Sequence, residues 1–137
     1  MPAVPHSQEA ARRVLVVEDQ EDCLAMMVEL ISTQGCEVRV ARDGQTALCV
    51  AQEFLPHVIL LDLGLPVIHG YEVAKALRRD PRTQHAVIVA VTGYGMESDR
   101  VRSAQAGIDR HLIKPVAFEE LAGLLRLHGV SDWTPLS

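Results

Sequence analysis

The chain has 137 residues, 48% of them hydrophobic, which allows one domain with a single substantial core. Its net charge of −5 excludes a protein that neutralises nucleic-acid phosphates with a basic surface. No apolar run approaches the ~20 residues that a membrane-spanning helix requires, and residues 1–13 lack the apolar centre of a secretory signal, so we expect a cytoplasmic protein.

The first half of the chain predicts two strand–helix units. Short apolar or alternating runs indicate strands, whereas apolar residues at three- and four-residue steps indicate helices. Glycine and proline mark the ends of the helices, because neither continues a helix well. In chain order, we expect a strand at Val14–Val17, a helix from Asp22 to Gly35, a strand at Glu37–Ala41, and a helix between the Asp43-Gly44 turn and Pro56.

The second half predicts three more units of the same kind. Its first two strands are apolar at every position, which indicates burial on both faces of a sheet. The helix after the second of these strands is more polar than the others. We expect, in chain order, a strand at Val58–Leu61, a helix marked by Val73, Ala74 and Leu77, a strand at Val87–Val91, a helix at Glu97–Ala106, a strand at His111–Ile113, and a helix marked by Phe118, Leu121, Leu124 and Leu125.

Five strand–helix repeats with doubly buried strands predict an α/β fold. The expected architecture is a three-layer sandwich with a five-stranded parallel sheet and five helices. Right-handed crossovers leave few topologies, and the flavodoxin-like strand order 2-1-3-4-5 is the natural choice. We expect the domain to span residues 12–128, between a disordered tail at 1–11 and a C-terminal tail at 129–137.

Chemically active side chains follow four of the five predicted strands. The carboxyl ends of parallel strands meet at one edge, which is where ligands bind in open α/β sheets. Each residue alone has a plainer explanation, since acidic residues and threonines often cap helices and lysines are usually solvated. Their joint occurrence favours a site. Its members are Glu18 and Asp19 after the first strand, Asp62 after the third, Thr92 after the fourth and Lys114 after the fifth.

The three carboxylates predict a divalent cation. Clustered carboxylates repel one another unless a cation lies among them, and a site with few oxygen ligands suits Mg²⁺ better than Ca²⁺. Asp19 and Asp62 would bind the ion directly, Glu18 would act through a metal-bound water, and the Gly64 carbonyl would reach the same ion. The three cysteines lack Cys-x-x-Cys spacing and indicate neither zinc nor a disulfide framework.

The lysine and the threonine complete a set suited to phosphoryl transfer. Catalysis of this reaction consists mainly of positioning and of neutralising charge on the phosphoryl oxygens. Lys114 and Thr92 would each bind one oxygen. Asp62 would be the nucleophile that forms an acyl phosphate.

Four segments resemble the receiver domains of bacterial two-component response regulators. They are VLVVEDQED, VILLDLGLPVIHGYEVAKALR, VIVAVTGYG and GIDRHLIKP, and the resemblance covers about residues 12–128. It implies Glu18 and Asp19 as the acidic pair, Asp62 as the phosphoacceptor, Thr92 as the switch hydroxyl, and Lys114 as the phosphate-binding lysine with a cis bond to Pro115.

The resemblance also implies a function and partners. A receiver takes its phosphoryl group from a phosphohistidine of a histidine kinase or histidine phosphotransfer protein, with Mg²⁺ bound, and then switches a protein-interaction surface. It catalyses its own phosphorylation and dephosphorylation without being a conventional turnover enzyme. The chain is expected to be a stand-alone regulator, a phosphorelay intermediate or the receiver of a hybrid histidine kinase, with no nucleic-acid or membrane partner.

His111 departs from the family pattern, which usually has Tyr or Phe at this position. In the family, that aromatic side chain rotates inward when the threonine moves toward the phosphate. A histidine can also move between buried and exposed positions, although its charge depends on pH. Two roles for His111 therefore stay open: a switch residue, or a partly exposed residue with no switching role.

Three other functions are weighed against this one. A flavodoxin-like cofactor binder needs a Ser/Thr/Gly-rich phosphate loop after the first strand, where this chain is acidic. A phosphatase with an aspartate nucleophile usually has a second aspartate where Gly64 stands. A degenerate receiver that acts only as an interaction module usually lacks the acidic pair, the acceptor or the lysine, and all of these are present.

Overall fold

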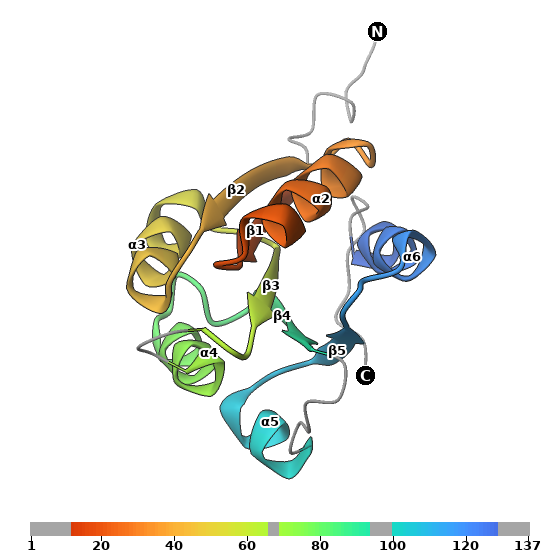
Figure 1. The fold of residues 1–137 in the computed structure, drawn as a ribbon. Coiled ribbons are helices and arrows are strands. Elements are labelled where there is room, and N and C mark those ends of the chain that lie inside the picture. The colour runs from red at the N-terminus through yellow and green to blue at the C-terminus, as the bar shows by residue number, and fades with distance from the viewer. Residues whose placement is uncertain (1–11, 66–68, 94–99, 129–137) are drawn as a thin grey trace, which may run out of the picture.

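Five strands and five helices alternate along the chain (Figure 1). The computed structural model describes residues 12–65, 69–93 and 100–128, so both predicted tails, 1–11 and 129–137, lie outside the described residues. The elements are β1 (Arg13–Val17), α2 (Glu21–Ser32), β2 (Glu37–Ala41), α3 (Gly44–Phe54), β3 (Val58–Asp62), α4 (Gly70–Arg79), β4 (Val87–Thr92), α5 (Arg100–Ala106), β5 (Arg110–Ile113) and α6 (Phe118–His128).

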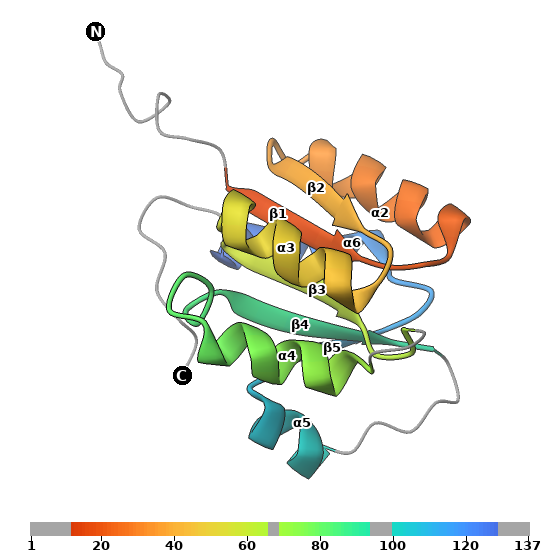
Figure 2. The same cartoon turned by 90° about the vertical axis from the view of Figure 1, so that its left-hand side faces the viewer.

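The strands form one parallel sheet in the order β2-β1-β3-β4-β5, as predicted. Helices α2 and α6 cover one face of the sheet, and α3, α4 and α5 cover the other (Figures 1 and 2). The three-layer α/β sandwich expected from the sequence is therefore confirmed. None of the helices in the described residues is both long and apolar enough to cross a membrane.

The core has two layers because side chains of a strand alternate between the faces of the sheet. On β1, Val14 and Val16 pack with α2 and α6, while Leu15 and Val17 pack with α3 and α4. All residues of β3 and β4 are buried, as continuous apolar runs in a covered parallel sheet require. The edge strand β2 is exposed at three of its five positions.

The predicted ends of two strands differ from those in the structure. Asp62 and Thr92 were expected to follow their strands, but they are the last residues of β3 and β4. The ladder extends that far because Asp62 is opposite Val91 and Thr92 is opposite Ile113. Both residues are therefore held by the sheet. The helix expected at Glu97–Ala106 is described only from Arg100, since residues 94–99 lie outside the described ranges.

Candidate phosphoacceptor site

Three carboxylates gather at the carboxyl ends of β1 and β3. Ligand oxygens of Glu18, Asp19 and Asp62 all lie within 4.8 Å of one another. Glu18 and Asp62 are buried, with 1% and 6% of their surface exposed, whereas Asp19 is exposed. The sequence predicted this cluster, because residues that follow neighbouring parallel strands meet at the same edge.

Glu18 is held by the backbone on one side of its carboxylate. Its Oε2 accepts a hydrogen bond from the Gln20 N–H at 3.0 Å. Its Oε1 is fully buried and receives no hydrogen bond from the described residues. Lys114 Nζ lies 2.8 Å from Oε1 and pairs with its charge without hydrogen-bond geometry. A buried carboxylate oxygen of this kind has capacity for a further ligand.

Asp62 is oriented from both sides. Its Oδ1 accepts a hydrogen bond from the Gly64 N–H at 2.9 Å, and its Oδ2 lies 3.4 Å from Lys114 Nζ. Burial raises the pKa of Asp62 above its usual value, and the Glu18 charge adds to this, against the lowering effects of the Gly64 N–H and the Lys114 charge. An added positive charge at this point would therefore stabilise the ionised form of Asp62.

Lys114 reaches the cluster from the end of β5. The Lys114–Pro115 peptide bond is cis, and the Lys114 N–H donates to the Thr92 carbonyl at 2.7 Å. Partial burial lowers the pKa of Lys114, but contact with Glu18 and the charges of Asp62 and Glu18 outweigh it and hold the pKa above its usual value. The ammonium group therefore stays charged at neutral pH.

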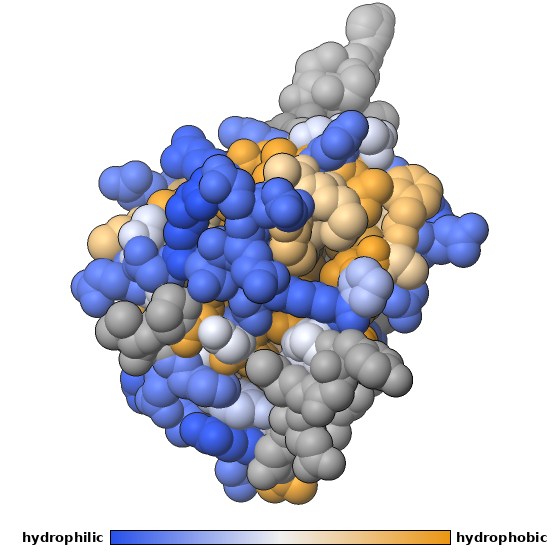
Figure 3. All heavy atoms as spheres, viewed as in Figure 1, coloured by the Kyte–Doolittle hydropathy of each residue, from blue (hydrophilic) through white to orange (hydrophobic). Residues whose placement is uncertain are grey.

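Thr92 and Gly64 are the remaining residues of the predicted site. Thr92 is buried at the end of β4, with 3% of its surface exposed. A hollow of about 290 Å³ is lined by Asp19, Gln20, Asp62, Gly64, Gly93 and Lys114. On the face viewed in Figure 3, polar residues gather at the centre, and apolar residues border them.

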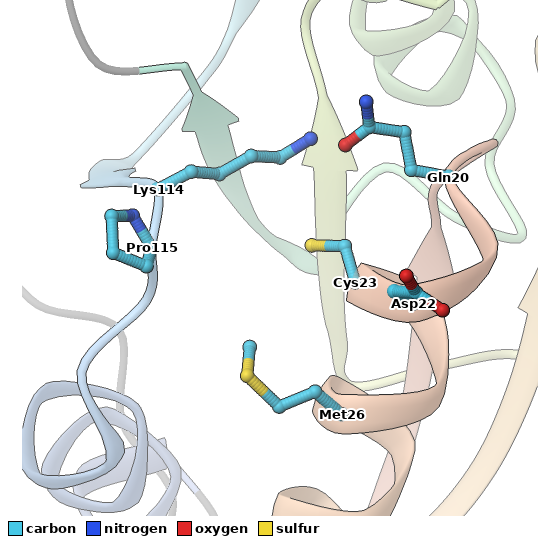
Figure 4. Close-up of a pocket in the computed structure, with 6 residues that line it drawn as sticks. All are labelled: Gln20, Asp22, Cys23, Met26, Lys114 and Pro115. Atoms are coloured by element: carbon cyan, nitrogen blue, oxygen red, sulfur yellow. The ribbon is translucent and has the colours of Figure 1, made fainter.

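A second, more apolar hollow of about 410 Å³ lies beside the first. Figure 4 shows Lys114 extending from β5 toward Gln20, with Cys23 pointing into the space between them; the lining residues are Gln20, Asp22, Cys23, Met26, Lys114 and Pro115. Burial, together with the Glu18 charge, raises the pKa of the Cys23 thiol to about 11. The thiol is therefore neutral at pH 7, which makes it a poor metal ligand.

The donor set fits a hard divalent cation. Two buried carboxylates and one exposed carboxylate offer only oxygen ligands, and the adjoining hollow leaves room for water and for a phosphoryl group. Asp19, Asp62 and Glu18 are the residues that would hold the ion. Mg²⁺ meets these requirements better than a softer metal, which would prefer nitrogen or sulfur ligands.

Close packing at Gly70 fixes the helix that follows the Asp62 loop. A Cβ atom on Gly70 would lie 2.8 Å from Leu63 Cα and 3.0 Å from the Asp62 carbonyl oxygen. Only glycine allows this approach without a shift of the backbone. The N-terminus of α4 therefore rests directly against the residues that carry the site.

His111 is joined to two residues that the sequence did not single out. Its Nε2 lies 2.9 Å from Ser103 Oγ on α5, and Ser103 Oγ lies 3.4 Å from the Tyr71 hydroxyl on α4. Tyr71 in turn stacks on His69 and carries the Arg102 guanidinium over its ring. In the sequence, Ser103 is one serine on a polar helix, which by itself does not predict a partner.

The fold and this edge of the sheet define a class of protein. Five parallel strands in the order 2-1-3-4-5, with acidic residues, a threonine and a lysine at the strand ends, are the arrangement of a phosphoacceptor signalling domain. The family model described as "Response regulator receiver domain" matches residues 14–126. The chain belongs to this family and is a receiver domain of two-component signalling.

Individual relatives agree with this assignment. The chain is 36% identical over 106 residues to the polar-differentiation response regulator DivK of Brucella anthropi, covering 77% of this chain and 86% of the relative. It is similar to the receiver domain of sensor histidine kinase PA1611 from Pseudomonas aeruginosa PAO1 (TM-score 0.77, 29% identity, 85% of this chain and 96% of that one), whose structure has a magnesium ion coordinated in the active site cleft. It is also similar to the chemotaxis protein CheY4 of Vibrio cholerae (TM-score 0.79, 29% identity, 85% and 98%).

Proposed function

We propose that Asp62 accepts a phosphoryl group from a phosphohistidine donor in a Mg²⁺-dependent reaction, and that this switches a protein-interaction surface. The observation that carries the proposal is the position of Asp62. It is a buried carboxylate at the end of a central strand, with two further carboxylates and Lys114 around it.

The roles of the residues follow from their chemistry. A carboxylate oxygen of Asp62 attacks phosphorus; the new O–P bond forms as the P–N bond to the donor imidazole breaks, and the imidazole leaves with the electron pair. Lys114 exchanges its contact with Asp62 for a phosphoryl oxygen, and the buried Thr92 hydroxyl binds another. Mg²⁺ held by Asp19, Asp62, Glu18 and the Gly64 carbonyl would neutralise charge on the transferred group.

The partners in this proposal are a histidine kinase or a histidine phosphotransfer protein, and the reaction takes place in the cytoplasm. The domain that carries it out spans residues 12–128. It catalyses its own phosphorylation and dephosphorylation, which is not conventional turnover. A receiver that acts only as an interaction module is the competing function, and it predicts no covalent change at Asp62.

The test is phosphoryl addition, measured by intact mass after incubation with Mg²⁺ and a small-molecule phosphodonor. We expect one phosphoryl group on the native protein and none after EDTA treatment or in Asp62→Asn. Asp22→Asn is the matched control, because Asp22 lines the neighbouring hollow but is not part of the carboxylate cluster. Absence of phosphoryl gain in folded protein that binds Mg²⁺ would overturn the proposal in favour of an interaction module.

A further inference from the structure

The strand β2 forms one edge of the sheet and pairs, within the described residues, only with β1 (Figure 1). Successive residues of a strand direct their backbone groups to opposite sides. The Glu37 N–H donates to the Arg12 carbonyl at 2.8 Å, which turns the backbone groups of Glu37 toward β1. The N–H and C=O groups of Val38 and Val40 therefore point away from the sheet, where another strand can bind them.

The side chains of β2 form a charged face and an apolar face. The Arg39 guanidinium lies 4.8 Å from the centre of a phenylalanine ring on α3, and Glu37 shares this side because side chains alternate along a strand. Both residues are exposed, and neither has an ion-pair partner in the part of the chain that the structure describes. On the α2 side, Cys36 and Val38 pack against the core, and Val40 is 40% exposed.

A second copy of β2 is complementary to the first in one antiparallel register. When Val38 is opposite Val38 of the second copy, the outward backbone groups of both strands form hydrogen-bonded pairs. Glu37 of each copy is then opposite Arg39 of the other, in the non-hydrogen-bonded pairs where side chains approach most closely. A shift by two residues in either direction places Arg39 opposite Arg39 or Glu37 opposite Glu37, and both arrangements are repulsive.

We propose that two copies of this chain associate through β2, in the antiparallel register centred on Val38, and form one continuous sheet. Each copy uses the same surface, so the assembly closes as a dimer. Charged residues on edge strands usually oppose pairing between sheets. On β2 the order of the charges makes Glu37 and Arg39 attract their counterparts in this register. The inference goes beyond the proposed role of Asp62 and does not depend on it.

The proposed dimer keeps the two phosphoacceptor sites apart. Glu18, Asp19 and Asp62 lie at the carboxyl ends of β1 and β3. Antiparallel pairing directs these ends of the two copies in opposite directions, so each site opens at its own end of the joined sheet. The Ala41 carbonyl accepts a hydrogen bond from the Glu18 N–H at 3.0 Å, so β2 supports the acidic cluster on its inner side while its outer side binds the second copy.

The first experiment measures the oligomeric state by sedimentation equilibrium over concentrations that extend to the millimolar range. The native chain should form a dimer. Glu37→Arg and Arg39→Glu should each raise the dimer dissociation constant by about thirtyfold, because two attractions are lost and two repulsions of similar size replace them. An equimolar mixture of the two variants should form a heterodimer, because one copy is then positive at both positions and the other is negative at both.

Glu120→Arg is the matched control, since it makes the same charge change at an exposed position on α6, which follows the opposite edge strand β5. It should dimerise like the native chain. A native chain that stays monomeric, a dimer that persists in Glu37→Arg, or a mixture of the two variants without heterodimer would each overturn the proposal. Glu37→Arg and its control decide the matter if Arg39→Glu does not fold.

The second experiment locates the contact by hydrogen exchange at low and high protein concentration. The Val38 and Val40 amides should exchange about tenfold more slowly when about nine-tenths of the protein is dimeric, because they then bond to the second copy. The Glu37 amide is bonded to Arg12 in either state and should not respond to concentration. A dimer whose formation leaves exchange at Val38 and Val40 unchanged would overturn association through β2.

Discussion

Lys114 Nζ lies 2.8 Å from Glu18 Oε1, which places a cation from the edge strand β5 inside the acidic cluster at the end of β1. The same ammonium group lies 3.4 Å from Asp62 Oδ2. One positive charge therefore faces three carboxylates, and the cluster keeps an excess of negative charge. This imbalance favours a divalent cation at the carboxylates and leaves the lysine available for an anion.

The first prediction concerns Lys114→Met. Removing the ammonium group removes a repulsive charge from the cation site, so the affinity for Mg²⁺ should rise by at least about tenfold. A unit charge about 4 Å from a divalent ion costs about 2 kcal/mol even at the dielectric constant of water, and more near a protein surface. Isothermal titration calorimetry measures this directly. Lys75→Met is the control, since Lys75 pairs with Glu72 on the exposed side of α4. Equal Mg²⁺ affinity in Lys114→Met and the native protein would show that the lysine does not share the site.

The second prediction concerns stabilisation by Mg²⁺. An ion that binds only the folded protein, at 100 times its Kd, should raise the free energy of unfolding by about 2.7 kcal/mol. Asp19→Asn should abolish most of this gain, and because Asp19 is exposed, the variant should be as stable as the native protein without Mg²⁺. Urea unfolding with and without Mg²⁺ measures both effects. A full Mg²⁺ response in Asp19→Asn would remove this residue from the ligand set.

The third prediction concerns Arg78, which joins α4 to the loop before β4 and to the loop before β5. Its guanidinium group donates to the carbonyls of Gln84, Ala86 and Gly107, and it pairs with Asp109 at 2.7 Å. Lysine cannot reproduce this planar set of donors, so Arg78→Lys should lose about 2–3 kcal/mol of stability in urea unfolding. Arg79→Lys, on the exposed side of α4, should change stability by less than about 0.5 kcal/mol. Phosphoryl addition to Asp62 should persist in both.

The fourth prediction concerns His57, whose Nδ1 accepts a hydrogen bond from the Arg13 N–H at 3.0 Å. Burial, together with the charges of Arg13 and Arg12, lowers the pKa of His57 to about 4. The folded protein therefore binds this proton less readily than the unfolded chain, whose histidine has a pKa near 6.5. Its contribution to stability is complete above about pH 6.5 and is lost as the pH falls toward 4.

Urea unfolding at a series of pH values measures this contribution. The free energy of unfolding of the native protein should fall between pH 6.5 and 4, with a slope from His57 of at most about 1.4 kcal/mol per pH unit, less what solvent screening removes. His57→Gln should flatten the slope, whereas His85→Gln, at an exposed position, should not. An equal slope in His57→Gln and the native protein would assign the acid sensitivity to other groups.

The sequence predicted the fold and the acidic cluster because both depend on local signals. The apolar runs at β1, β3 and β4 identify buried strands, and polar residues at their ends mark where the chain leaves the core. Parallel topology then brings Glu18, Asp19 and Asp62 together without any further information. The predicted ends of β3 and β4 were one residue short, because the ladder extends through a polar residue when the neighbouring strand continues to pair with it.

The features that the sequence did not predict are contacts between distant elements. Ser103 looks like an ordinary helical serine until α4 and β5 place Tyr71 and His111 beside it. Arg78 looks like a basic residue suited to the last turn of a helix, yet its side chain bonds to carbonyls from two loops. Such contacts depend on the packing angle of each helix, which no pattern within a single element specifies.

The negative and positive charges of the site lie at strands that differ in how many neighbours they pair with. Glu18 and Asp62 adjoin β1 and β3, which have a hydrogen-bonded neighbour on both sides, whereas Lys114 follows the four-residue strand β5, which is paired only with β4. The negative charges are thus built into the most constrained part of the sheet, and the positive charge is carried by its least constrained margin. Small displacements at that margin change the electrostatic potential at the mouth of the site without disturbing the core. Because Lys114 contacts the carboxylates, such a displacement changes the attraction for anions and the attraction for cations in opposite directions.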